Sequence, residues 1–346
     1  MLTRKSIISA LSVILVFAST TFAQLSSSST MSKVGTTVAQ FLKIGPSARA
    51  IGMGGAFTAS SDDIGLIYWN PAGLARLSSS AAMFTHTQWI AGTNYEFMAV
   101  ALDLYSVGTM GLMVSSFTSG DMAVRTVDMP DGTGEKFNTA DLMIGLSFAR
   151  NLTNKFSIGG NVKFIHQRLW HMTASTVALD IGTLFTTPFY GIRLGASMSN
   201  FGPKMRLDGR DIKFANDPDP REEGNVEFVN AQYEMLYYSI PLYFQIGLAK
   251  DFDLGYNNRL TLAADAIHPN DNYEAVNAGV EYSFKNMFFL RAGYKSLFQK
   301  DSEEGLTLGV GLNYRLMSTV VLKIDYAYAD FGVLENVQRF SLGLRF

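Results

Sequence analysis

Apolar residues alternate with polar or small residues along most of the chain after residue 78. In the last such run, Phe340, Leu342, Leu344 and Phe346 occupy every second position. Side chains of a β-strand point alternately to its two faces, so a period of two predicts a strand with one apolar face. Runs of this kind predict about fourteen strands of roughly 9–13 residues, a length typical of tilted membrane strands. They cover residues 79–90, 95–105, 107–118, 137–149, 155–167, 173–186, 190–199, 236–249, 258–268, 273–284, 287–296, 304–315, 319–329 and 336–346.

The predicted connections also alternate in length. The two longest, residues 119–136 and 200–235, both belong to the odd-numbered set, whereas the even-numbered connections are short. Outer-membrane barrels have short periplasmic turns and longer extracellular loops. A soluble β-sandwich, the alternative, gives no reason for this alternation. The sequence therefore predicts an all-β membrane protein, a 14-stranded antiparallel outer-membrane β-barrel (residues 79–346) that is monomeric and has both mature termini in the periplasm.

The second face of the predicted strands carries the charges. If the apolar face contacts outer-membrane lipid, the other face lines the lumen, and closure of the sheet leaves no unpaired edge in hydrocarbon. The predicted lumenal charges are Lys163, Asp180, Arg193, Asp265, Glu281, Arg291, Lys323, Asp325, Arg339 and Arg345.

The N-terminus resembles an export signal. Arg4 and Lys5 precede the apolar stretch Ile7–Ala18, and small residues at Thr21 and Ala23 suit a cleavage site. This apolar stretch is shorter than the roughly 20 residues that a membrane-spanning helix needs. We expect a signal peptide over residues 1–23 and a mature protein in the cell outer membrane.

Composition excludes several function classes. The chain has no Cys, which excludes disulfide scaffolds, thiolate metal sites and thiol nucleophiles. Its 28 Lys and Arg balance 30 Asp and Glu, so no strong basic field points to nucleic acid. The spacing of the four histidines suits no metal site, and no nucleophile motif is present. We therefore expect a protein that is not an enzyme and that needs no cofactor or metal.

Residues 24–78 do not alternate. A Ser-rich flexible leader is predicted over 24–40, and a compact plug, or hatch, over 41–78. In the plug, Gly54 and Gly55 permit tight backbone approach, while Asn70 and Pro71 suit the cap and first position of a helix that Ala72 continues. We expect these five residues to have a structural or gating role.

The plug also carries a family resemblance. The runs SARAIGMGGAFTA (47–59) and NPAGLA (70–75), followed by alternating strands and a terminal Phe, resemble the PorV/PorQ family of outer-membrane proteins. That family is similar in fold to the FadL-type transporters, which also have fourteen-stranded barrels with an N-terminal hatch. The motif match covers residues 41–76, and the barrel matches only in pattern.

The resemblance implies two candidate functions. A PorV/PorQ-type barrel is a component of the type IX protein secretion system that binds secreted cargo or anchors the surface attachment complex with other subunits. The alternative is a FadL-like transporter of long-chain fatty acids or other hydrophobic small molecules, which leave through a lateral opening in the barrel wall. The loop 200–235 could be a docking surface for a protein partner or only a solvated loop. Its candidate docking residues are Asp208, Asp211, Asp217, Asp219, Glu222 and Glu223.

Overall fold

The structure is a computed structural model, and it describes residues 33–218, 228–299 and 302–346 of the 346-residue chain. Residues 34–346 form one compact unit. The predicted signal peptide and residues 24–32 of the predicted leader lie outside the described residues.

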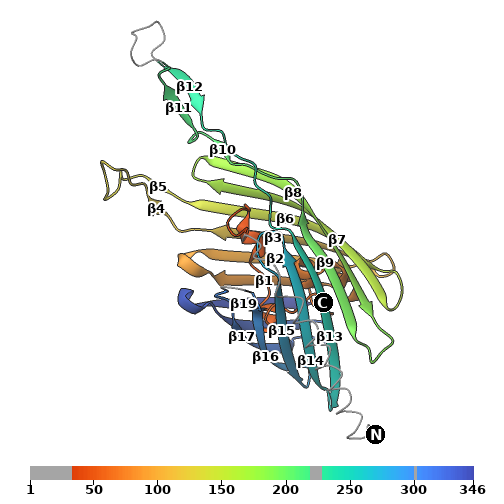
Figure 1. The fold of residues 1–346 in the computed structure, drawn as a ribbon. Coiled ribbons are helices and arrows are strands. Elements are labelled where there is room, and N and C mark those ends of the chain that lie inside the picture. The colour runs from red at the N-terminus through yellow and green to blue at the C-terminus, as the bar shows by residue number, and fades with distance from the viewer. Residues whose placement is uncertain (1–32, 219–227, 300–301) are drawn as a thin grey trace. The chain divides into compact units, whose positions relative to one another are not determined.

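Fourteen antiparallel strands close into a barrel (Figure 1). Each barrel strand pairs with the barrel strands that come before and after it in the chain. The first strand, β1, pairs with the last, β19, and this pairing closes the ring. The ring consists of β1 (Ala81–Gln88), β2 (Asn94–Asp103), β3 (Thr109–Thr118), β6 (Thr139–Asn151), β7 (Phe156–Leu169), β8 (Met172–Thr186), β9 (Arg193–Phe201), β13 (Tyr243–Gly255), β14 (Asn258–Pro269), β15 (Ala275–Phe284), β16 (Phe288–Leu297), β17 (Leu306–Arg315), β18 (Val321–Asp330) and β19 (Asn336–Arg345). This confirms the predicted fold and the predicted number of strands.

The two ends of the barrel differ in their connections. One end, the short-turn end, carries only brief turns, such as Tyr256 and Asn257 between β13 and β14. The other, the long-loop end, carries two hairpins and two short 3-10 helices (Figure 1). These elements are β4 (Met122–Ala123) with β5 (Lys136–Phe137), β11 (Lys213–Asn216) with β12 (Val229–Gln232), the short strand β10 (Asp208–Gly209), η3 (Ile90–Gly92) and η4 (Gly332–Leu334).

One predicted strand is shifted along the chain. The pattern predicts a strand over 236–249, but β13 runs from Tyr243 to Gly255. Pro241 interrupts the predicted strand because it has no N–H for a ladder hydrogen bond. Upstream of it, Tyr238 forms an isolated bridge with Met205 instead. The connection between β9 and β13 is therefore longer than predicted.

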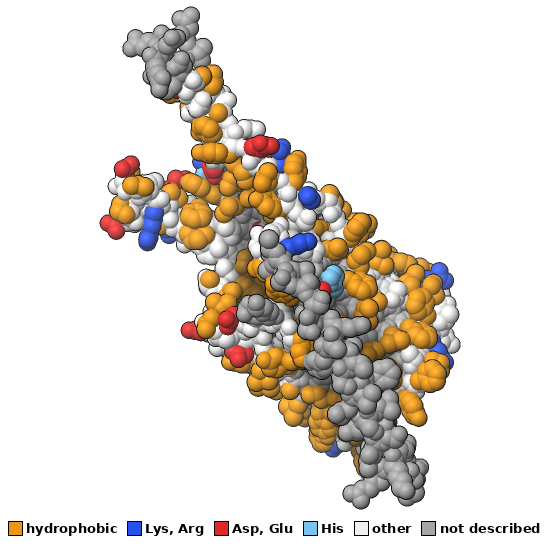
Figure 2. Space-filling model, in the orientation of Figure 1, with side chains coloured by type: hydrophobic (Ala, Val, Ile, Leu, Met, Phe, Trp, Pro, Cys, Tyr) orange, Lys and Arg blue, Asp and Glu red, His pale blue; other side chains and the backbone are white. Residues whose placement is uncertain are grey.

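The two faces of the wall match the prediction. Apolar side chains cover the outside, as Figure 2 shows for the face in view, and they include Phe340, Leu342 and Leu344 of the last strand. The predicted lumenal charges face inward, and Lys163, Glu281 and Arg339 are each no more than 1% exposed.

Residues 34–78, the N-terminal segment, lie against the inward face of the wall. The segment contains η1 (Gln40–Lys43), α2 (Ala48–Gly52), α3 (Leu66–Trp69) and η2 (Pro71–Arg76). Helix α2 contacts β16 to β19, whereas η2 contacts β6 to β8 across the ring, so the segment spans the barrel interior. Among the described residues, no helix has the length and apolar character needed to cross a bilayer.

Candidate functional site

The Asn-Pro-Ala motif joins the N-terminal segment to one side of the wall. Asn70 is fully buried and caps η2, its Oδ1 accepting the N–H of Ala72 at 3.2 Å. Its Nδ2 donates to the carbonyl oxygen of Thr58 at 2.7 Å and to that of Thr183 in β8 at 3.0 Å. The amide therefore ties together two parts of the segment and one strand of the barrel.

Gly54 and Gly55 meet the opposite side of the wall. Both have positive φ, +68° and +75°. A Cβ on Gly54 would lie 2.7 Å from the carbonyl oxygen of Ala278 and 2.8 Å from the backbone nitrogen of Tyr294, closer than real Cβ atoms approach. The missing side chain therefore permits the close contact between the segment and strands β15 and β16.

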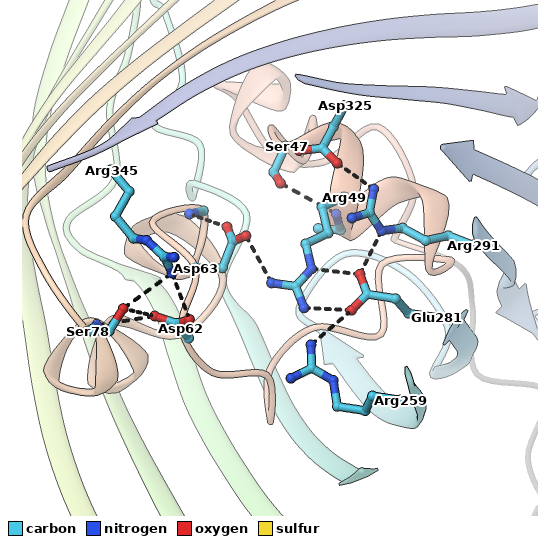
Figure 3. A network of polar contacts seen from close by, with 12 residues as sticks. Ser47, Arg49, Asp62, Asp63, Ser78, Arg259, Glu281, Arg291, Asp325 and Arg345 are labelled. Carbon is cyan, nitrogen blue, oxygen red and sulfur yellow. Dashed lines mark hydrogen bonds and ion pairs between the residues drawn. The ribbon is translucent and has the colours of Figure 1, made fainter. Parts of the chain in front are cut away.

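An ion-pair network anchors the segment on the short-turn side (Figure 3). Arg49 of α2 donates from Nε and Nη2 to the two carboxylate oxygens of Glu281 at 2.8 Å each, and from Nη1 to Asp63 at 3.0 Å. Glu281, on β15, also accepts from Arg291 at 2.7 Å, and Arg291 donates to Asp325 at 2.5 Å. Burial alone would raise the pKa of Asp63, but the charges of Arg49 and Lys323 and the bonds it accepts lower that pKa below its ordinary value.

The lumen near the short-turn end is a strongly charged cavity of about 780 Å³. Cationic side chains outnumber acidic ones in its lining. The cations are Arg49, Arg193, Arg259, Lys285, Arg291, Arg315, Lys323 and Arg345, and the acids are Asp62, Asp63, Asp251 and Asp325. An apolar solute would have to displace the hydration of these charges to pass, which disfavours that route.

A cavity of about 310 Å³ lies between the N-terminal segment and the wall near the long-loop end. The segment contributes Tyr68 and Trp69, whose rings meet edge to face at 5.4 Å, and the wall contributes Tyr243 and Ile267. Tyr68 is fixed by a hydrogen bond from its hydroxyl to the carbonyl oxygen of Leu42 at 2.7 Å. These rings give the cavity an apolar part that suits an apolar ligand, while hydroxyl, amide and charged side chains make up most of the remaining lining.

The lysines that line this cavity are all paired. Lys163 lies 2.6 Å from Asp180 of β8, Lys43 lies 2.5 Å from Asp271 in the β14–β15 loop, and Lys295 pairs with Glu304. Burial alone would raise the pKa of Asp271, but bonds from Lys43 and Thr37 lower it. The ion pair between Lys43 and Asp271 also attaches η1 to the long-loop end. There, Thr37 forms an isolated β-bridge with Ser239.

A second opening of about 540 Å³ lies beside this cavity. It is lined by residues 38–41 and 44 of the segment, by Trp89 after β1, and by Phe117, Asp141 and Gln167 near the long-loop ends of β3, β6 and β7. It shares Lys43 and Glu304 with the first cavity. The two spaces therefore lie next to each other near the long-loop end.

Three of the six predicted docking residues lie among the described residues. Asp208 lies in β10, which pairs with β8, and Asp211 accepts from His171 at 3.0 Å. Asp217 follows β11, while Asp219, Glu222 and Glu223 lie outside the described residues. Nearby, the hairpin β11–β12 carries the exposed aromatic pair Phe214 and Tyr233, with ring centroids 4.8 Å apart.

The cavity near the long-loop end was not predicted from the sequence. Its residues come from the N-terminal segment and from six strands and two loops, many of them distant in sequence. One available signal was the set of inward-facing glycines in the strands, since strand glycines often mark a close backbone approach. Gly159 and Gly182 face the Asn-Pro-Ala motif, and Gly279 and Gly293 face Met53 and Gly54. Among the described residues, no three His, Asp or Glu side chains gather in a way that could hold a metal ion.

Comparisons with known proteins place this fold among outer-membrane channels. The uncharacterised protein family UPF0164 matches residues 15–168, which is less than half of the chain. No curated protein matches the chain.

Solved structures match nearly the whole barrel at low sequence identity. The CymD monoaromatic hydrocarbon channel is 12% identical with a TM-score of 0.52, and the match covers 87% of this chain and 96% of CymD. The Pseudomonas putida toluene transporter TodX is 10% identical with a TM-score of 0.52, covering 87% and 97%. A Pseudomonas aeruginosa FadL homologue is 11% identical with a TM-score of 0.48, covering 85% and 96%. The fold of this chain is therefore the outer-membrane barrel fold that CymD and TodX share, whereas the narrower PorV/PorQ resemblance receives no support.

Proposed function

We propose that this protein is an outer-membrane channel for small hydrophobic compounds. The observation that carries the proposal is the aromatic cavity of about 310 Å³ between the N-terminal segment and the wall. The fold supports it, because solved channels for monoaromatic hydrocarbons share that fold. The apolar outer face of the barrel supports a position in the outer membrane.

In this proposal, the N-terminal segment is the plug. Its contacts with opposite sides of the ring close the lumen, with Asn70, Pro71 and Ala72 at β7 and β8 and with Gly54 and Gly55 at β15 and β16. The long-loop end faces the outside and the short-turn end faces the periplasm, as in other outer-membrane barrels. A compound enters beside residues 38–44 and rests in the aromatic cavity.

The exit from the cavity is lateral in this proposal. The alternative, straight passage to the periplasm, crosses the buried network of Arg49, Glu281 and Arg291 and the charged cavity beneath it. A hydrophobic compound would find no favourable contacts in this charged region and would disturb its paired charges. Passage through the wall into the membrane is therefore favoured.

Uptake by cells tests the proposal. Deletion of the gene should lower the uptake rate of radiolabelled toluene at low concentration, and a plasmid copy should restore it. Equal uptake in the deletion strain and its parent, with the protein shown to be present in the parent's outer membrane, would overturn the channel.

A second candidate function is a protein-docking component of the type IX secretion system. The exposed aromatic pair Phe214 and Tyr233 on the β11–β12 hairpin favours it, because aromatic residues often anchor protein interfaces. Affinity purification should then recover a defined secreted or attachment protein with the wild type but not with a Phe214→Ser variant. A deletion strain that exports its surface proteins normally would contradict this function.

A further inference from the structure

Asn277 on β15 is built into the wall at a break in the strand pairing. Val276 pairs with Leu297 and Ala278 pairs with Tyr294, so Asn277 stands opposite a β-bulge in β16. The N–H of Ser296 donates to Oδ1 of Asn277 at 2.8 Å, in place of a backbone carbonyl. This bond fixes the side-chain amide, because the oxygen must face the strand and Nδ2 must point away from it.

The amide nitrogen of Asn277 is an unused donor. Asn277 is 1% exposed and lines the aromatic cavity, and its Nδ2 has no hydrogen-bond partner among the described residues. A buried donor without an acceptor costs free energy, so a ligand oxygen within hydrogen-bond distance of Nδ2 would be bound favourably.

Gly55 packs closely against this donor and against Trp69. A Cβ on Gly55 would lie 3.0 Å from Nδ2 of Asn277 and 3.3 Å from the ring of Trp69. A side chain at this position would therefore crowd both Nδ2 of Asn277 and the Trp69 ring.

The charges of the cavity favour a neutral ligand. Lys43, Lys163 and Lys295 each pair with a carboxylate, and Glu303 adds a further acid to the lining. An anionic ligand would lose its hydration without gaining an unpaired cation. A neutral oxygen needs only the one donor that Asn277 offers.

We propose that this cavity binds neutral hydrophobic compounds that carry a hydrogen-bond-accepting oxygen, with that oxygen on Nδ2 of Asn277. The proposal rests on the proposed channel function and narrows its substrate class. Asn277 is then the residue that distinguishes such compounds from plain hydrocarbons and from carboxylates.

Binding to the purified full-length protein in detergent tests the proposal. The chain has three Trp residues, so Trp89→Phe together with Trp170→Phe leaves Trp69, in the cavity, as the fluorescent reporter. The probes are cyclohexanone, methylcyclohexane of similar size, and cyclohexanecarboxylate. We expect cyclohexanone to bind about five- to tenfold more tightly than methylcyclohexane, as one net hydrogen bond allows. Cyclohexanecarboxylate should bind more weakly than the ketone.

Substitution of Asn277 isolates the donor. Asn277→Asp keeps an oxygen for the N–H of Ser296 but loses the amide donor, so at pH 8 it should abolish the preference for the ketone over methylcyclohexane. The matched control is Asn313→Asp, which makes the same change in the cavity at the short-turn end and should keep the preference.

The outcomes separate this proposal from the channel function. Equal affinity for ketone and hydrocarbon in the wild type, a preference that persists in Asn277→Asp, or tightest binding of the carboxylate would overturn the role of Asn277 while leaving the channel intact. Absence of binding by all three probes, together with normal toluene uptake in the deletion strain, would overturn both.

Discussion

The two cavities of the lumen differ in chemistry although strands β9, β13, β14 and β16 line both. Near the long-loop end, aromatic rings and paired lysines surround a cavity of about 310 Å³. Near the short-turn end, eight cationic side chains and four acidic ones line a larger cavity. The N-terminal segment lines both cavities, with its Lys43–Asp271 pair at the first and its Arg49–Glu281 pair at the second. Under the proposed function, this difference lets one barrel hold an apolar compound on one side and oppose its passage on the other.

Glu281→Gln should have the largest effect on this division. It leaves Arg49 and Arg291 buried without their shared carboxylate, which should destabilise the fold by about 3–5 kcal/mol. Urea unfolding in detergent measures the loss, and planar-bilayer conductance reports whether the lumen opens. The control, Glu335→Gln, changes an exposed acid and should alter neither quantity. Wild-type stability in Glu281→Gln would contradict the anchoring role of the network.

Gly54→Ala tests the close contact between segment and wall. Both Gly54 and Gly35 have positive φ, but only at Gly54 would a Cβ meet backbone atoms, since nothing lies within 4 Å at Gly35. Gly35→Ala therefore measures the backbone strain alone. We expect Gly54→Ala to lose about 1–3 kcal/mol more than Gly35→Ala, because the wall must shift. Equal losses in urea unfolding would show that the contact does not matter.

Asn70→Ala tests the attachment on the other side of the ring. The variant leaves the carbonyl oxygens of Thr58 and Thr183 without their donor and should lose about 1–3 kcal/mol. Limited proteolysis should then cleave within residues 56–78 at lower denaturant concentration than in the wild type. Unchanged protease resistance would count against a structural role for the motif.

Acid should weaken the Lys43–Asp271 ion pair at the long-loop end. We expect this effect to be smaller than those of the three substitutions above. The pKa of Asp271 is lower in the folded protein than the ordinary value of about 3.9, so its contribution is present above that value and is lost as pH falls through the folded-state pKa. Proteolysis of residues 33–43 by pepsin should therefore accelerate below about pH 4. In Asp271→Asn, cleavage of residues 33–43 should already be faster than in the wild type at the highest pH tested. Its rate should not change as the pH falls through this range.

The barrel could be predicted because membrane strands repeat a simple rule. Every second residue from Val320 to Tyr328 is apolar, and the same rule assigned Lys163 and Glu281 to the lumen. The shift of β13 shows where the rule fails, since the alternation continues through Leu236 to Tyr238 although Pro241 ends the ladder. Alternation reports which face a side chain takes, but not where the hydrogen bonding of a ladder begins.

The site was less predictable than the fold. The motif residues Asn70 and Gly54 stood out in the sequence, but their partners on β8 and β15 depend on how the segment crosses the barrel. Asn277 could be assigned to the inward face by alternation. Its unpaired donor results from a bulge opposite Ser296, which no local pattern marks. Contacts between distant segments therefore decide the chemistry of the cavity.

The central claim is that hydrophobic compounds pass through the aromatic cavity. Uptake by a variant in which this cavity is filled tests that claim most directly. Ala275 faces the aromatic cavity and its neighbour Val276 lies on the opposite face of β15, so Ala275→Trp should fill the cavity while Val276→Trp should add the same bulk outside it. In a deletion strain that carries either variant at equal outer-membrane levels, the account predicts that toluene uptake is lost with Ala275→Trp and retained with Val276→Trp. Full uptake with Ala275→Trp would contradict it.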